Sequence, residues 1–148
     1  MIFRSIMVIC TGNICRSPAG ERLLQRLLPD MQIDSAGVPG LSGHPADRMM
    51  QVVCEAGGIS LEGHISRPVT PAMLRTYDLL LVMEQSHIRQ LTERVPEIRG
   101  KILLFSHWAE NVSQRNIRDP YGLSRQVYEQ VFLQLETAAV TWAQHLRK

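Results

Sequence analysis

The apolar run over residues 6–10 constrains the fold of this chain more than any other stretch. A short, continuous apolar run is typical of a strand buried on both faces, as in a parallel sheet. A turn that contains glycine follows, and then Ser17 and Pro18, which predict the N-cap and first position of a helix. Leucines at helical spacing come next. The chain therefore begins with a strand, a tight loop and a helix.

The same alternation of strands and helices continues to the end of the chain. We expect strands at 31–36, 78–83 and 101–105, helices opened by Pro45, by Thr70-Pro71, by Gln85 and by Ser124, and a loop over 106–123. Such alternation implies a parallel sheet with helices on both faces. We predict one domain over residues 1–148, with a three-layer α/β fold and a four-stranded parallel sheet.

Composition excludes several functional classes. The net charge of +2 is too small to indicate nucleic-acid binding. Three cysteines, an odd number in a chain of 148 residues, fit a reducing cytoplasm better than a disulfide scaffold. No signal peptide is recognisable, and no apolar stretch reaches the length of a membrane span. We therefore expect a cytoplasmic protein that does not insert into membranes.

The loop of residues 10–17 is the predicted functional site. Parallel sheets bind ligands beyond the carboxyl ends of their strands, and Cys10 ends the first strand. A plant-type iron–sulfur spacing would need a cysteine where Pro18 stands, and the five histidines are too scattered for a zinc site. The Walker nucleotide loop requires a lysine, which this loop does not have. No metal or cofactor is expected.

The spacing from Cys10 to Arg16, with five residues between them, fits a loop that holds an oxyanion. Gly12 would allow left-handed backbone and close approach of a ligand, and Asn13 tolerates a positive φ. Backbone N–H groups of such a loop and the N-terminus of the following helix attract an anion. We expect Cys10 as a thiolate nucleophile and Arg16 as a planar partner for two phosphate oxygens. These groups suit phosphoryl transfer through a cysteinyl-phosphate intermediate.

The segment "VICTGNICRSP" resembles the signature loop of the low-molecular-weight protein-tyrosine phosphatases. The likeness continues through "DSAG", "YDLLLVME" and "RDPY" and spans nearly the whole chain. "SLEGH", "RGKILLF" and "GLSGHPAD" resemble the enterobacterial branch, which acts in exopolysaccharide and capsule production. The resemblance implies a four-stranded parallel sheet flanked by helices and hydrolysis of phosphotyrosine. The implied fold agrees with the fold read from the pattern of strands and helices.

Asp119 is the candidate general acid. It lies on the loop after the last predicted strand, at the same sheet edge as Cys10. From the residues alone, Asp119-Pro120 is also a common start of a turn. The resemblance of "RDPY" to the family motif implies that Asp119 first protonates the leaving oxygen and then acts as base for the water that releases phosphate from Cys10.

The resemblance also implies supporting roles around the loop. Ser17, an N-cap candidate, would also donate a hydrogen bond to the Cys10 thiolate, and His64 would anchor Asn13 through a hydrogen-bond network. Cys15 is either a small buried residue or the partner of Cys10 in a reversible disulfide, as in relatives. The other residues of the predicted phosphate-binding loop are Thr11, Gly12 and Ile14.

The walls of the cleft should be Tyr121 on one side and Leu41 on the other. In many eukaryotic relatives an aromatic residue of the same loop forms the second wall, and Leu41 is the residue of this chain nearest to that position. This difference predicts a looser and more aliphatic cleft, with less selectivity among phosphopeptides.

Three other functions compete with a tyrosine phosphatase. Arsenate reductases of this fold need two further cysteines, and only Cys54 is available. Protein-arginine phosphatases have threonine where Ile14 follows the loop asparagine. A non-catalytic phosphopeptide-binding module would not need Cys10, Arg16 and Asp119 together. By resemblance, the partner would be the tyrosine-rich tail of a membrane-anchored tyrosine autokinase in polysaccharide export, and the chain would act as a monomer.

Overall fold

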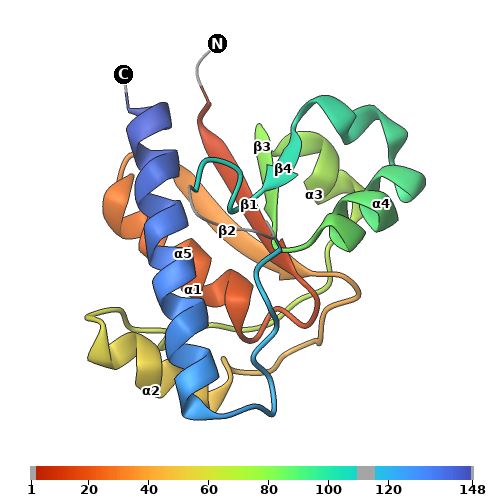
Figure 1. The fold of residues 1–148 in the computed structure, drawn as a ribbon. Coiled ribbons are helices and arrows are strands. Elements are labelled where there is room, and N and C mark those ends of the chain that lie inside the picture. Colours follow the sequence, from red (N-terminus) through yellow and green to blue (C-terminus); the bar gives the residue numbers. More distant parts are fainter. Residues whose placement is uncertain (1–2, 110–115, 148) are drawn as a thin grey trace.

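Four parallel strands form the centre of this computed structural model, which describes residues 3–109 and 116–147 (Figure 1). They are β1 (Ser5–Cys10), β2 (Gln32–Gly37), β3 (Leu79–Val82) and β4 (Ile102–Leu104). Their order in the sheet is β2-β1-β3-β4, with all pairs parallel. The predicted four-stranded parallel sheet is confirmed. Because β1 has β2 on one side and β3 on the other, the strand order reverses beside the end of β1.

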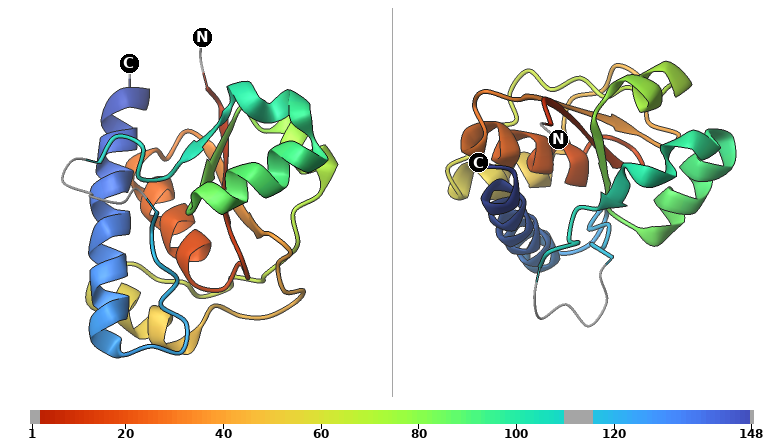
Figure 2. Two further views of the ribbon diagram at one scale, coloured as in Figure 1. Left: turned by 45° about the vertical axis from the view of Figure 1, so that its right-hand side comes forward. Right: turned by 90° about the horizontal axis from the view of Figure 1, so that it is seen from above.

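Helices cover both faces of the sheet, as predicted (Figure 2). One face packs against α1 (Arg16–Leu27), α2 (Arg48–Ala56) and α5 (Arg125–Leu146). The other packs against α3 (Pro71–Thr76), α4 (Gln85–Arg94) and the 3₁₀ turn η1 (Pro96–Gly100), which the sequence did not predict. None of the described helices is long and apolar enough to cross a membrane.

Alternate side chains of β1 enter two separate cores. Ile6 and Val8 pack beneath α1 and α5, whereas Met7 and Ile9 pack beneath α3 and α4. All four side chains are fully buried. The continuous apolar run over residues 6–10 is therefore explained by a strand with no solvent-facing side.

Two helix starts differ from the prediction. The first helix starts at Arg16, one residue before Ser17, with Cys15 as its N-cap residue. The second starts at Arg48 and not at Pro45, because the Asp47 carboxylate accepts the Met50 N–H and so supplies the cap. Thr70 and Ser124 cap α3 and α5 as predicted. The predicted loop over 106–123 has no helix or strand at 106–109 or 116–123, and residues 110–115 lie outside the described residues.

Candidate active site

The backbone of the loop after β1 is held from outside through its carbonyl oxygens. The contacts are Val38 N–H to Cys10 O, Gly40 N–H to Thr11 O, Leu41 N–H to Gly12 O, His64 Nε2 to Asn13 O and Asp47 N–H to Ile14 O. In a trans peptide, the C=O and the following N–H point in opposite directions. The N–H groups of residues 11–15 therefore face the inside of the loop, where they can bind an anion.

Asn13 supplies the left-handed turn of this loop, with a φ of 61°. Its side chain holds that conformation by donating to Ser17 Oγ at 2.8 Å and Ser35 Oγ at 3.1 Å, while its Oδ1 accepts the Arg67 N–H. Of the two residues expected to allow left-handed backbone, Asn13 makes the turn and Gly12 does not, and a Cβ at Gly12 would meet only Ile14, at 3.6 Å.

Ser17 acts on Cys10 and does not cap the helix. Its Oγ lies 3.0 Å from Cys10 Sγ and already accepts a hydrogen bond from Asn13. The Ser17 hydroxyl hydrogen is therefore available to the Cys10 sulfur. A donor in this place stabilises a thiolate. Of the two roles considered for Ser17, the geometry supports the hydrogen bond to Cys10.

Arg16 is buried, with 1% of its surface exposed, beside Cys10. Its Nη1 donates to the Glu84 carboxylate at 2.5 Å and to Ile117 O at 2.7 Å, and its Nη2 donates to Thr11 Oγ1 at 3.3 Å. Among the described residues, its Nε is the one buried side-chain nitrogen or oxygen with no hydrogen-bond partner. Because an unpaired buried donor is costly, this atom indicates a ligand that accepts a hydrogen bond.

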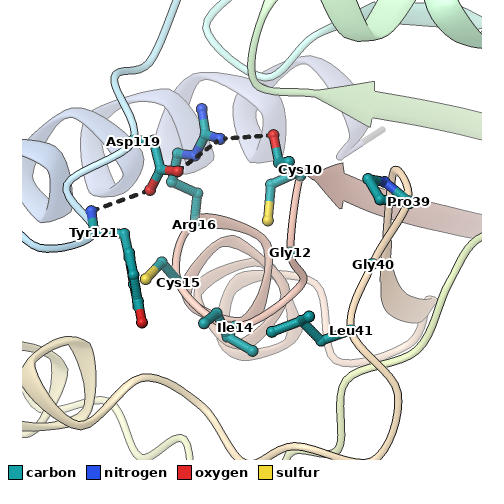
Figure 3. A pocket seen from close by; sticks show the side chains of 11 residues that line it. Cys10, Gly12, Ile14, Cys15, Arg16, Pro39, Gly40, Leu41, Asp119 and Tyr121 are labelled. Carbon is teal, nitrogen blue, oxygen red and sulfur yellow. Dashed lines mark hydrogen bonds and ion pairs between the residues drawn. The ribbon is translucent and has the colours of Figure 1, made fainter.

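The loop forms the floor of a pocket of about 300 Å³. Figure 3 shows Tyr121 on one side of this pocket and Leu41 on the other, with Ile14 between them. Both residues predicted as walls line this pocket. Tyr121 is 62% exposed and Leu41 is 42% exposed, so a flat substrate ring can enter between them.

Asp119 reaches the same pocket from the loop before α5 (Figure 3). Its Oδ2 lies 3.9 Å from Arg16 Nη2, and its Oδ1 accepts the Tyr121 N–H at 3.1 Å. Its carboxyl group therefore lies at the rim, beside the guanidinium that faces Cys10. This is a suitable place for a proton donor to a leaving group.

Three predicted residues, Asn13, Ser17 and His64, are buried and do not line the pocket. The ring of His64 contacts Asn13 O at 2.6 Å. Burial lowers the pKa of His64, so its neutral ring donates this bond. Cys15 lines the pocket, and its thiol is free. Burial, with the Asp47 charge second, raises the pKa of Cys15, so that thiol stays protonated near neutral pH.

Several residues of the site were not predicted. Glu84 and His87 come from the start of α4, and Ser35 and Gly37 from β2. A Cβ at Gly37 would lie 2.6 Å from Thr11 O, so only glycine fits beneath the loop. Glu84 could have been found, because an acidic residue two positions after the end of β3 lies at the same sheet edge as Cys10. The contacts of Ser35 and His87 depend on tertiary packing.

No group of three or more His, Cys, Asp or Glu side chains that could hold a metal ion occurs in residues 3–109 and 116–147. The pocket instead combines a thiol, a guanidinium, a carboxylate and inward N–H groups. This set of groups can bind a tetrahedral oxyanion over a sulfur nucleophile.

Known proteins resemble this chain over most of their length. The chain is 51% identical over 146 residues to the low molecular weight protein-tyrosine-phosphatase Etp of Escherichia coli K12, covering 99% of this chain and 97% of the relative. The tyrosine phosphatase Wzb from Escherichia coli K30, solved in complex with sulphate, superposes with a TM-score of 0.94 at 50% identity and covers 99% of this chain and 100% of its own.

A more distant likeness is to the YwlE arginine phosphatase from Geobacillus stearothermophilus, with a TM-score of 0.89 and 30% identity over 97% of this chain and 92% of its own. The family described as "Low molecular weight phosphotyrosine protein phosphatase" matches residues 5–148. These likenesses agree with the loop signature and with the fold. The chain belongs to the low molecular weight phosphotyrosine protein phosphatase family.

Proposed function

We propose that this chain hydrolyses phosphotyrosine in proteins through a phosphate ester of Cys10. The observation that carries the proposal is the unpaired Nε of buried Arg16 beside the Cys10 sulfur. Together with the inward N–H groups of the loop, it offers donors to the non-bridging oxygens of a phosphoryl group. Sulphate bound to the related Wzb supports an oxyanion as the natural occupant.

The reaction divides into two steps. The Cys10 thiolate attacks phosphorus, the phosphorus–oxygen bond to the tyrosine breaks, and Asp119 gives its proton to the departing oxygen. The Asp119 carboxylate then takes a proton from water, the water oxygen attacks phosphorus, and the sulfur–phosphorus bond breaks. Phosphate leaves, and Cys10 and Asp119 return to their starting forms. Through its hydrogen bond to Cys10, Ser17 stabilises the thiolate both as the attacking group of the first step and as the leaving group of the second.

The pocket walls favour an aryl phosphate. Tyr121 and Leu41 can contact the two faces of a phenyl ring, while the phosphoryl group reaches the loop at the floor. A serine phosphate is shorter and would leave these walls without contact. We propose further that the substrate is the tyrosine-rich tail of a tyrosine autokinase in polysaccharide export, met in the cytoplasm by a monomeric phosphatase.

A phosphoarginine phosphatase is the second candidate, favoured by the likeness to YwlE. Ile14 argues against it, because the arginine phosphatases are expected to have threonine there. The test compares the purified chain on one peptide in three forms, with phosphotyrosine, phosphoarginine or phosphoserine at the same position. We expect kcat/KM for phosphotyrosine to be the highest by at least 10-fold. Preference for phosphoarginine would overturn the proposed substrate.

The matched control for this assay is Cys10→Ser. The alkoxide needed from serine is far less available than a thiolate, so hydrolysis should be abolished. Binding of inorganic phosphate should survive, because Arg16 and the loop amides remain. Turnover by the variant at more than about a hundredth of the normal rate would remove Cys10 from the mechanism.

A further inference from the structure

His87 is a buried histidine at the site that the proposed reaction does not use. Its ring is 2% exposed and lies in the first turn of α4. Nδ1 accepts the backbone N–H of Glu84 at 3.2 Å, so the ring proton is on Nε2. Burial and the nearby positive charge of Arg16 lower the pKa of His87 to about 4. The neutral ring therefore donates its Nε2–H to Thr11 Oγ1, at 2.9 Å.

Thr11 Oγ1 accepts hydrogen bonds from two donors. It accepts one hydrogen bond from His87 and a second from Arg16 Nη2 at 3.3 Å. A hydroxyl oxygen has two lone pairs, and these two bonds use both of them. Thr11 itself is exposed at the mouth of the loop. Without His87, its χ1 angle would be free to turn the oxygen away from Arg16.

The first turn of α4 therefore reaches Arg16 at both ends of the guanidinium. Glu84 holds Nη1 directly, and its side chain also accepts the backbone N–H of His87 in a capping box. His87 holds Nη2 through Thr11. Because a guanidinium is planar, fixing both Nη atoms fixes the direction of Nε, the unpaired donor.

We propose that His87 is a positioning residue that acts through Thr11 Oγ1 to hold the Arg16 guanidinium in the plane that binds a phosphate oxyanion. The inference rests on the proposed function in one respect, that Arg16 Nε and Nη2 face the phosphoryl group. His87 itself touches no substrate atom and transfers no proton. Its effect is on the affinity of the site for the oxyanion.

The experiment is a double-variant cycle with inorganic phosphate as the probe. The dissociation constant of phosphate is measured by NMR titration for the unchanged protein, Thr11→Val, His87→Leu and the double variant. Each single change should weaken phosphate binding about 3- to 10-fold, as expected for an indirect hydrogen bond to a charged group. The double variant should bind no more weakly than Thr11→Val alone, because both changes break one connection. Thr11→Ser, which keeps the oxygen, should recover most of the affinity.

Thr92→Val is the matched control. Thr92 is a buried threonine of the same helix, and its hydroxyl donates to the α4 carbonyls of Ile88 and Arg89. The phosphate affinity of the Thr92→Val variant should stay within twofold of that of the unchanged protein. Kinetics with a phosphotyrosine peptide add a second readout. KM should rise with little change in kcat, because Arg16 contacts the phosphoryl group in the ground state and in the transition state alike.

Two results would overturn the proposal. One is additive losses in the double variant, which would mean that His87 acts without Thr11. The other is unchanged phosphate affinity in Thr11→Val. If His87→Leu does not fold, the Nε2 resonance of His87 is compared between Thr11→Val and Thr11→Ser, and it should move only in the first. The phosphate titration needs no turnover, so a chain that failed to hydrolyse phosphotyrosine would still test His87.

Discussion

At the scale of single residues, the role of Asp119 can be separated from its place in the loop by leaving-group chemistry. A phenol of pKa about 10 needs a proton when it leaves, whereas an activated nitrophenol needs little help. Asp119→Asn should slow cleavage of phosphotyrosine by roughly 10²- to 10⁴-fold, and the loss should shrink as the leaving group improves.

The measurement is the rate of phosphorylation of Cys10 across a series of substituted phenyl phosphates. Burst kinetics are needed, because hydrolysis of the cysteinyl phosphate becomes limiting for good leaving groups. An equal loss for every substrate would mean that Asp119 only holds the Tyr121 N–H and the loop around it.

Cys15 carries a second prediction at the residue scale. It lines the same pocket as Cys10, and both thiols are free. Peroxide should oxidise Cys10 to the sulfenic acid. The Cys15 thiol should then react with this sulfenic acid to form a disulfide, which a thiol reductant reverses. In Cys15→Ser, the same treatment should cause irreversible loss of activity, because Cys10 would go on to the sulfinic acid. Peptide mass spectrometry of the oxidised protein checks the pairing, and a bond from Cys10 to Cys54 would contradict it.

At the scale of helices and strands, the start of α4 makes stability depend on pH. The pKa of His87 in the folded chain, about 4, lies below the ordinary value of 6.5. Between these values the unfolded chain binds the proton and the folded chain does not, so the free energy of unfolding falls as pH drops from 6.5 towards 4. His64 shifts in the same direction and adds to the effect.

Urea unfolding at pH 7 and at pH 5 measures this dependence. The loss of stability between the two pH values should be smaller in His87→Leu than in the unchanged protein, because leucine does not titrate. Thr92→Val provides the control on the same helix and should lose as much as the unchanged protein. An equal loss in His87→Leu would mean that His87 has an ordinary pKa in the folded state.

The elements also show what a sequence pattern can and cannot predict. The run over residues 6–10 predicted β1 because both of its faces are buried, and Thr70 and Ser124 marked helix starts through local capping. The starts of α1 and α2 were misplaced because Ser17 bonds to Cys10 instead of the helix end, and because Asp47, not Pro45, caps α2. The cap of α2 is a local contact, since Asp47 and Met50 are three residues apart, whereas the bond from Ser17 to Cys10 requires the loop to fold back over the start of α1.

The residues of the site likewise fall into those that the sequence indicates and those that only the folded structure reveals. Cys10 and Arg16 follow from a spaced motif after a buried strand, whereas Asp119 was assigned by the resemblance of "RDPY" to the family motif, and the structure places all three around one pocket. The contacts of His87 with Thr11 and of Ser35 with Asn13 join residues 76 and 22 positions apart. No periodicity or spacing predicts such pairs, because only the packing of α4 and β2 against the loop creates them.

At the scale of the whole molecule, phosphate should stabilise the fold, since the site is assembled from segments distant in the sequence. Arg16, Glu84 and Ile117 belong to separate segments that meet at the guanidinium. The unfolded chain cannot hold the Arg16 guanidinium beside the loop N–H groups, so a ligand that binds these donors favours the folded state. At a phosphate concentration 100 times its dissociation constant, the gain is about 2.7 kcal/mol. For a chain of this size, this corresponds to a rise in Tm of roughly 5–10 °C.

Thermal unfolding of Cys10→Ser and of Cys10→Ser/Arg16→Lys, with and without phosphate, tests this linkage without interference from turnover. The serine variant should keep the rise in Tm, because its amides and guanidinium are intact. The double variant should lose most of it, because lysine has one nitrogen and cannot reproduce the planar pair of Nε and Nη2. Sodium chloride at equal ionic strength is the control for general screening, and should move both variants alike. An equal phosphate-induced rise in the two variants would place the stabilising anion elsewhere on the molecule and would separate Arg16 from the oxyanion site.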